Sequence, residues 1–208
     1  MSERLAKGGV RDPRVLEALR GVPRHLFVPE ALHDRSYLSV SLPIGEGQTI
    51  SAPQVVAAMS EALELTGSET VLEVGTGSGY QCAILSCLAG RVVSIERRPK
   101  LAALARTNLD QLGVTNAVVH LGDGSTGRAA DAPFDAILVT AAGPEVPKPL
   151  LEQLAPGGRL VGPFGERDEQ KLIRVRRGEA ADGPDAYTRE VIGRVRFVDL
   201  VGAHGWAA

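Results

Sequence analysis

The chain is short of cysteine and of clustered metal ligands. Only two of its 208 residues are cysteines, and Cys82 and Cys87 are five positions apart. That spacing suits neither a zinc knuckle nor a C-x-x-C redox pair, so we expect both to be small buried side chains. The four histidines are scattered without the spacing of metal ligands. We therefore expect no metal site.

Long apolar runs and an excess of charge are also missing. No stretch approaches the length that spans a membrane, and the N-terminal segment MSERLAKGGVRD lacks the apolar region of a signal peptide. The formal net charge is -2 and the pI is near 6.1, which argues against a surface for nucleic acid. We expect a cytoplasmic protein, acting as a monomer, that binds neither membranes nor nucleic acid.

Apolar residues make up 44% of the chain, and strand and helix patterns alternate along its middle. The predicted strands cover 70–74, 91–95, 117–121, 134–140 and 159–163, and the predicted helices cover 79–89, 99–112 and 147–154. Such alternation with short turns is typical of an α/β fold with a Rossmann-like, doubly wound, mostly parallel sheet. The length suits one domain.

Segments on both sides of this core depart from its pattern. Residues 1–66 form an N-terminal extension with helices predicted at 12–20 and 51–65, and residues 67–165 form the core. In the last segment, 166–208, strands predicted at 171–176 and 191–200 flank a loop at 178–186 that is rich in Gly, Asp and Pro. We expect these two strands to form an antiparallel edge pair.

A glycine-spaced turn follows the first core strand. Residues 71–79 read VLEVGTGSG, so Gly75, Gly77 and Gly79 alternate with Thr76 and Ser78. Glycine lets the backbone turn sharply and approach a ligand at the start of the next helix. The third glycine comes one residue earlier than in the dinucleotide pattern G-x-G-x-x-G. We expect this turn to bind a cofactor other than a dinucleotide.

Glu73, two positions before the turn, indicates the charge of that cofactor. A carboxylate near the carboxyl end of the strand would repel a pyrophosphate and attract a cation. S-adenosylmethionine carries a sulfonium and an ammonium group, so it fits where a nicotinamide or flavin dinucleotide does not. The turn therefore predicts a methyl donor.

Polar residues also stand at the carboxyl ends of the next three strands. Glu96 is placed to accept both ribose hydroxyls, Asp123, followed by Gly124, to accept from the adenine amino group, and Thr140 to form the floor of the reactive centre. Each alone suits an ordinary turn or capping residue, but acids in register with a glycine turn favour a cofactor site. Asp135 begins its strand, at the opposite edge, and is expected to be structural.

A second glycine-rich loop precedes the helix predicted at 51–65. Residues 42–51 read LPIGEGQTIS, and Ser51 with Gln54 fits the S-x-x-Q capping box. The hydroxyl of Ser51 and the amides of a helix N-terminus attract an anion. Ser51 is thus either a helix cap, an anion contact, or both.

These motifs together resemble the protein-L-isoaspartate O-methyltransferase family, and the resemblance covers almost the whole chain. The proline-flanked N-terminal motif combined with QTIS is far more specific than the glycine turn. The matching segments are VPRHLFVP at 22–29, LPIG at 42–45, GQTIS at 47–51, residues 71–80, GDG at 122–124, residues 134–142 and 147–158, and VRFV at 195–198.

The resemblance implies transfer of a methyl group from S-adenosylmethionine to the free carboxylate of L-isoaspartyl or D-aspartyl residues in damaged proteins and peptides, leaving S-adenosylhomocysteine. The ester would then collapse to a succinimide. By motif match, Ser51 is the active-site serine, and Gln48, Thr49 and Ile50 line the cofactor and substrate cleft. Asp199 stands where the resemblance predicts a proline.

A carboxylate acceptor requires no strong general base, because its pKa of ~4 leaves it ionised at neutral pH. The chain accordingly has neither the Asn/Asp-Pro-Pro-Tyr motif of amine methylation nor the Pro-Cys of cytosine chemistry. Two other hypotheses stay open. One is a related carboxyl methyltransferase that installs a succinimide in a biosynthetic peptide, and the other is a cofactor-binding module without catalysis. Intact Glu73, Glu96, Asp123 and Ser51 argue against the second.

Overall fold

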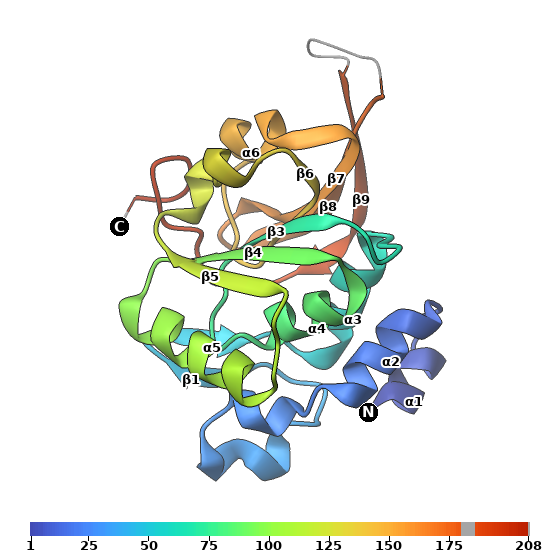
Figure 1. Ribbon diagram of the computed structural model, residues 1–208, viewed down its shortest axis with the longest axis vertical. Coiled ribbons are helices and arrows are strands. Elements are labelled where there is room, and N and C mark those ends of the chain that lie inside the picture. Colours follow the sequence, from blue (N-terminus) through green and yellow to red (C-terminus); the bar gives the residue numbers. More distant parts are fainter. Residues whose placement is uncertain (180–185, 208) are drawn as a thin grey trace.

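A seven-stranded sheet with helices on both faces forms the centre of the protein (Figure 1). The computed structural model describes residues 1–179 and 186–207. The strand order is β5-β4-β3-β6-β7-β8-β9, in which the first five strands run parallel and the last two antiparallel. The predicted doubly wound, mostly parallel α/β fold and its antiparallel edge pair are confirmed.

The core elements agree closely with the predicted ranges. The strands are β1 Leu42–Gly45, β2 Gln48–Ile50, β3 Thr70–Val74, β4 Arg91–Glu96, β5 Ala117–Leu121, β6 Phe134–Val139, β7 Leu154–Glu166, β8 Glu169–Arg177 and β9 Tyr187–Val195. The α-helices are α1 Ser2–Lys7, α2 Pro13–Gly21, α3 Pro53–Ala62, α4 Tyr80–Leu88, α5 Pro99–Gln111 and α6 Lys148–Glu152. The 3-10 helices are η1 Arg24–Phe27, η2 Glu30–Arg35, η3 Gly124–Thr126 and η4 Ala129–Asp131. None of the described helices is long and apolar enough to cross a membrane.

Differences from the predictions lie mainly outside the core. The glycine-rich loop at 42–51 contains an antiparallel hairpin, β1–β2, which Gly45 and Gly47 allow to turn with positive φ. The last predicted strand, 191–200, is displaced towards the N-terminus, so 198–201 leave the sheet. Of the predicted loop at 178–186, residues 180–185 lie outside the described part. Among the cysteines, Cys82 is buried as expected but Cys87 is exposed.

Each face of the sheet packs its own apolar core. Val71 faces a cluster that includes side chains of α2, α3, α4 and α5, whereas its neighbour Leu72 faces a cluster with α6 and Leu200. This follows from the alternation of side chains along a strand covered on both faces. Glu73 therefore points to the same face as Val71, among the helices that cover it.

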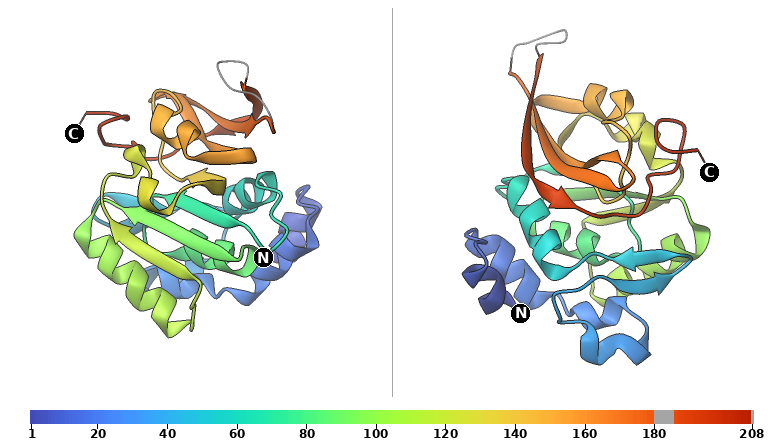
Figure 2. Two further views of the ribbon diagram at one scale, coloured as in Figure 1. Left: turned by 45° about the horizontal axis from the view of Figure 1, so that its top comes forward. Right: turned by 180° about the vertical axis from the view of Figure 1, so that it is seen from behind.

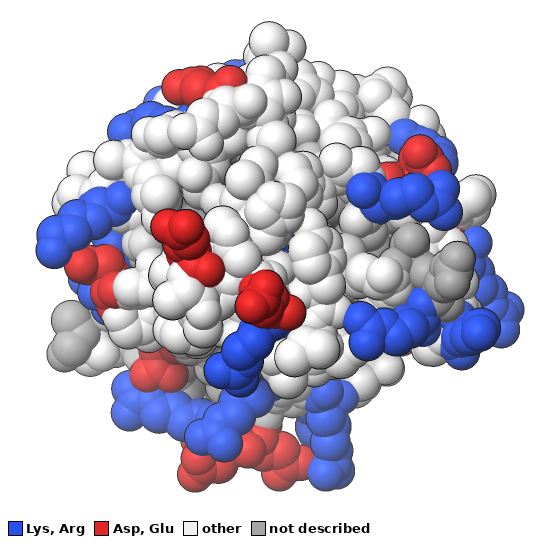
Figure 3. All heavy atoms as spheres, turned by 90° about the horizontal axis from the view of Figure 1, so that it is seen from below, with Lys and Arg blue, Asp and Glu red and all other residues white. Residues whose placement is uncertain are grey.

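The N-terminal segment leaves apolar side chains exposed. Leu26, Tyr37, Leu38 and Val40 are each at least 38% exposed, and all belong to η1 or to the chain just after η2. This segment lies at the bottom of Figure 1. Figure 3 shows the molecule from below, and most of the charged side chains in that view lie in its lower part and around its rim. The extension thus adds apolar surface near the hairpin.

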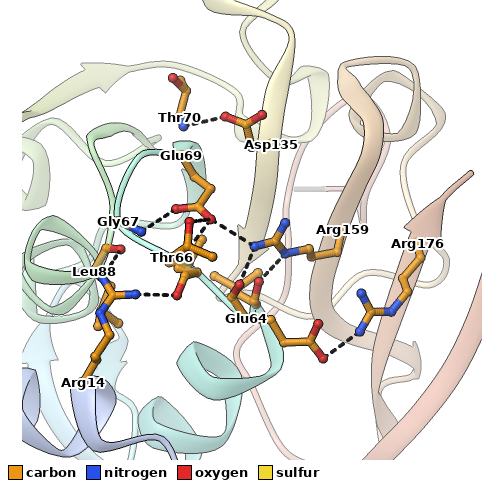
Figure 4. Close-up of polar contacts among 12 residues, drawn as sticks. Arg14, Glu64, Thr66, Gly67, Glu69, Thr70, Leu88, Asp135, Arg159 and Arg176 are labelled. Atoms are coloured by element: carbon orange, nitrogen blue, oxygen red, sulfur yellow. Dashed lines mark hydrogen bonds and ion pairs between the residues drawn. The ribbon is translucent and has the colours of Figure 1, made fainter. Parts of the chain in front are cut away.

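Two arginines fix the end of α3 (Figure 4). Arg159 of β7 donates hydrogen bonds to the carbonyls of Leu63 and Glu64, the latter at 2.7 Å. Arg14 of α2 donates to the carbonyl of Leu65 at 2.6 Å. These carbonyls belong to the C-cap Leu63 and the two residues after it. The guanidinium groups satisfy them where the helix ends and join the extension to the sheet.

Glu69 holds the turn that leads into β3. Its carboxylate accepts from the amides of Thr66 at 2.7 Å and Gly67 at 2.8 Å. Burial by itself raises the pKa of Glu69, but these amides outweigh it and bring the pKa to about 2. At the start of β3, the carboxylate of Asp135 accepts from the amide of Thr70 at 2.8 Å, which is the structural role expected of it. Hydrogen bonds from Glu69 and Asp135 thus hold the start of β3, the strand that leads into the glycine turn.

We predict that Glu69→Gln lowers the free energy of unfolding at pH 7. We also predict that the free energy of unfolding of this variant falls less than that of the wild type as the pH is lowered. The pKa of Glu69 is depressed in the folded state, so its contribution is complete above the ordinary value of 4.5 and falls away as the pH approaches 2. A shift of this size corresponds to about 3 kcal/mol. Urea unfolding of the wild type and the variant between pH 7 and 2 measures this difference. Glu152→Gln, at an exposed position, is the control. Parallel pH profiles for all three proteins would contradict the assignment.

Candidate active site

A cavity of about 430 Å3 lies at the carboxyl ends of β3, β4 and β6. Open α/β sheets bind ligands at this edge. Its walls come from six segments that are far apart in the sequence. They are the hairpin with the residues after it (Ile44, 47–51 and Val56), the glycine turn and start of α4 (74–78, Tyr80 and Gln81), the end of β4 (95–98), Gly124 after β5, Thr140 and Ala141 after β6, and the tail residues 198–201.

The glycine turn needs glycine for two different reasons. Gly75, Gly77 and Gly79 all have positive φ, a conformation that side chains other than glycine rarely adopt. At Gly75 a Cβ would also lie 2.5 Å from Oγ1 of Thr140, because the turn crosses directly over the end of β6. The turn therefore brings bare backbone to the cavity, as the sequence predicted.

Glu96 joins the turn to the end of β4. Its Oε2 accepts from the amide of Gly77 at 2.8 Å, and its Oε1 accepts from the amide of Arg98 at 2.9 Å. The side chain is 6% exposed and lines the cavity. Each carboxylate oxygen has a further lone pair, so Glu96 can accept from ligand hydroxyls while it holds the turn.

Glu73 differs from its predicted role. It is fully buried, does not line the cavity, and accepts from the hydroxyl of Ser94 at 2.5 Å, which in turn pairs with the hydroxyl of Thr76 at 2.5 Å. Burial is the largest cause of the raised pKa of Glu73, which is about 8, and the nearby charge of Glu96 raises this pKa further. Burial thus favours the uncharged form of this side chain, and direct attraction of a cation by Glu73 stays a prediction.

Asp123 is also placed differently. Its carboxylate accepts from the amide of Ser125 at 2.9 Å and from the amide of Ala203 at 2.7 Å. Gly124 lines the cavity, but Asp123 is not among the lining residues. Burial raises the pKa of Asp123, and the contacts with Ala203 and Ser125 outweigh it, so the pKa lies below the ordinary value. The structure thus directs this acid to the C-terminal tail, and its contact with an adenine group stays a prediction.

Ser51 lies at the cavity with residues 48–50, that is, Gln48, Thr49 and Ile50. The N-cap of α3 is Ala52 and its side chain caps nothing, so the predicted capping box is not formed. The side-chain Nε2 of Gln54 donates instead to the carbonyl of Ser39 at 3.3 Å. A role as a helix cap therefore does not account for Ser51.

Thr140 lies where it was predicted, whereas the tail was missed. The hydroxyl of Thr140 donates to the carbonyls of Val74 at 2.9 Å and Gly75 at 2.5 Å, and the side chain lines the cavity. Residues 198–201 also line it, although the sequence pattern predicted a strand as far as residue 200. Asp199, which stands where proline was predicted, was the one local signal that this segment is unusual.

Behind the cavity wall lies a buried cation that the sequence pattern did not identify. Arg24 is completely buried, and its Nε donates to the carbonyl of Ser36 at 2.7 Å. Its guanidinium carbon lies 4.9 Å from the ring centroid of Tyr80, which lines the cavity. This cation–π contact joins the N-terminal extension to the first residue of α4.

Comparison with known proteins assigns the chain to a family. The model of the protein-L-isoaspartate(D-aspartate) O-methyltransferase family matches residues 1–205. A protein-L-isoaspartate O-methyltransferase 1 from Syntrophobacter fumaroxidans is 54% identical over 97% of this chain and 92% of its own length. A protein-L-isoaspartate O-methyltransferase from Methanospirillum hungatei is 52% identical over 95% of this chain and 89% of its own.

A solved protein-L-isoaspartate O-methyltransferase structure shares the fold. It superposes with a TM-score of 0.85 at 28% sequence identity, covering 99% of this chain and 67% of that protein. The family depends on S-adenosylmethionine. The family match and the identities extend along nearly the whole chain, including the hairpin, the glycine turn and the tail that enclose the cavity. The chain belongs to the protein-L-isoaspartate(D-aspartate) O-methyltransferase family.

Proposed function

We propose that the cavity binds S-adenosylmethionine and transfers its methyl group to the free carboxylate of L-isoaspartyl or D-aspartyl residues in damaged proteins. One observation carries this proposal: Ser51 and the hairpin line the same cavity as the glycine turn and Glu96. A donor held by the turn and an acceptor held at Ser51 would meet in one enclosed space. The family's substrate, named in its description, supports the choice of acceptor.

The donor side is formed by backbone and one carboxylate. The turn residues Gly75, Thr76, Gly77 and Ser78 line the cavity, and Gly124 lines it from beside β5. Gly79 is the N-cap of α4 and is not among the lining residues. Glu96 has acceptor capacity for the ribose hydroxyls. The cofactor, when bound, supplies an electrophilic methyl group on a sulfonium. The protein's part is to hold it in place.

The acceptor requires orientation more than activation. A substrate carboxylate with a pKa of ~4 is already a nucleophile at pH 7. Its oxygen forms the new bond to the methyl carbon as the bond from that carbon to sulfur breaks, so the two opposite charges disappear together. Ser51 donates a hydrogen bond that points the carboxylate along this line. The methyl ester would then collapse to a succinimide.

We further propose that the protein acts as a monomer in the cytoplasm. The hairpin, the glycine turn and the tail that line the cavity all come from the same chain. Cys82 and Cys87 are free thiols, which suits a reducing compartment.

A pair of peptides tests the reaction. The two differ only in having isoaspartate or normal aspartate at one position, and transfer of label from methyl-labelled S-adenosylmethionine is counted. We expect labelling of the isoaspartyl peptide alone. Equal labelling of both would favour an enzyme that modifies a biosynthetic peptide, and no labelling would favour a module without catalysis. Size-exclusion chromatography of the same preparation tests the monomer.

We predict that Ser51→Ala lowers kcat about tenfold to hundredfold, since a hydrogen bond to a charged group contributes about 1.5–3 kcal/mol. Its thermal midpoint and its affinity for S-adenosylhomocysteine should stay near those of the wild type, because Ser51 caps no helix. Ser68→Ala, at an exposed position away from the cavity, is the matched control. A folded Ser51→Ala variant with wild-type turnover would remove Ser51 from the mechanism.

We predict that Glu73→Gln gains stability relative to the wild type as the pH rises. The pKa of Glu73 is raised from 4.5 to about 8, so the unfolded chain ionises first and the wild type loses several kcal/mol between these values. Glutamine keeps the shape and cannot ionise. Unfolding by urea at pH 5, 7 and 9 should show the difference widen up to about pH 8 and then level off. A constant difference would mean that Glu73 is ionised in the folded protein.

A further inference from the structure

The N-terminal extension places a positive charge inside the protein, against the start of α4. Arg24 opens η1 and is completely buried, and its Nε donates to the carbonyl of Ser36 at 2.7 Å. In the views of Figure 2, the extension (blue) lies on the same side of the sheet as α4 and α5 (green). The guanidinium group lies where these parts meet, because it contacts the ring of Tyr80 at the first position of α4.

The rest of this guanidinium group is not satisfied by the part of the protein that the structure describes. Neither Nη1 nor Nη2 of Arg24 has a hydrogen-bond partner there. None of the ion pairs among the described residues includes Arg24. Burial lowers the pKa of Arg24, but an arginine stays protonated near neutral pH. A buried charge is costly unless an anion balances it, so this site calls for an anion that the described residues do not supply.

Tyr80 lies between this charge and the cavity. The Cζ atom of Arg24 is 4.9 Å from the centroid of the Tyr80 ring, and Tyr80 lines the cavity. Phe27 packs on the same ring, with 5.3 Å between the two centroids, and thereby holds it in place. A buried charge is screened much less than an exposed one, so its field extends through the ring into the cavity.

The cavity wall on this side has no charge of its own. We call it the uncharged wall, and it consists of Ile44, Gly47, Gln48, Thr49, Ile50, Ser51, Val56, Tyr80 and Gln81. The charged lining residues Glu96, Arg97, Arg98 and Asp199 come from the end of β4 and from the tail. An anion that loses its water beside the uncharged wall meets the hydroxyl of Ser51 but no cation in the wall itself. Arg24 supplies a positive charge from behind it.

We propose that Arg24 is a positioning residue that acts through Tyr80, and that its charge balances the carboxylate of the isoaspartyl acceptor at Ser51. This rests on the proposed function, in which Ser51 orients that carboxylate. The hydroxyl supplies direction and Arg24 supplies charge. Methyl transfer converts the carboxylate into a neutral ester, so the cation attracts the substrate and has no such attraction for the product. Arg24 thereby makes the site selective for a free carboxylate.

Two variants remove the charge in different ways. Arg24→Gln keeps an amide that can still donate to the carbonyl of Ser36. Arg24→Met replaces the buried charge with an apolar chain, a type of change that is often neutral or stabilising. Arg24→Lys keeps the charge. Arg14→Gln is the matched control, because Arg14 also joins the extension to backbone carbonyls, those of Leu65 at 2.6 Å and Leu88 at 3.1 Å, and does not line the cavity.

Methylation of an isoaspartyl peptide is measured at saturating S-adenosylmethionine, with the same peptide bearing a carboxamide in place of its free carboxylate as competitive inhibitor. We expect the KM of the peptide to rise about tenfold in Arg24→Gln and Arg24→Met and to stay near the wild-type value in Arg24→Lys and Arg14→Gln. The kcat should not fall, because the charge of the carboxylate is already dispersing in the transition state. The Ki of the neutral carboxamide should be the same in all variants.

The comparison of KM with Ki separates charge from structure. An equal rise of both in the folded Arg24 variants would mean that loss of Arg24 only loosens the uncharged wall, and would overturn the proposal. An unchanged KM in folded Arg24→Gln and Arg24→Met would overturn it as well. The cofactor carries the other carboxylate that enters the cavity. Weaker binding of S-adenosylhomocysteine by calorimetry, with KM unchanged, would assign the charge to that group and remove the acceptor from the proposal.

The wild type is assayed first. Its failure to methylate the isoaspartyl peptide would count against the proposed function itself, whereas normal methylation with no effect of the Arg24 variants on KM would count against the role of Arg24 alone.

Discussion

The structure depends on the close crossing of the glycine turn over the end of β6. The backbone leaves β3 at Gly75 with positive φ and runs within contact of Thr140, whose hydroxyl in turn donates to the carbonyls of Val74 and Gly75. A side chain at Gly75 would separate the two strand ends. Because they stay together, the start of α4, the end of β4 and the floor of the cavity meet in one place, and Glu96 fastens the turn from the other side.

Two glutamates at neighbouring strand ends have opposite surroundings. Glu73 faces the helices inside the core, where burial raises its pKa to about 8 and a hydroxyl is its hydrogen-bond donor. Glu96 lies at the cavity edge and accepts from two backbone amides. In the sequence both are acids at the end of an apolar strand. Both point to the same face of the sheet, because Glu73 pairs with Ser94, two residues before Glu96. Their different roles arise from their position along the strand: Glu73 is covered by the core, whereas Glu96 lies at the cavity edge.

Both ends of the chain complete the site. The hairpin and Ser51 come from the N-terminal extension, which Arg24 joins to the cavity through Tyr80, and the opposite wall comes from the tail beyond β9. The α/β sheet itself accounts for the proposed methyl-donor side of the cavity, because the carboxyl ends of its parallel strands meet at one edge. Segments added before and after that core account for the acceptor side and for the enclosure.

The sequence by itself determined the alternating core, the glycine turn, the cofactor class and the family resemblance, because periodicity and glycine spacing act over a few residues. It also placed Thr140 and residues 48–51 at the site. It could not show that Ser51 lies before the cap of α3, that burial raises the pKa of Glu73, or that Asp123 holds the tail. Those depend on contacts between residues up to about 80 positions apart, such as Asp123 with Ala203, and on burial. Local pattern carries no information about either, so only the tertiary structure decided them.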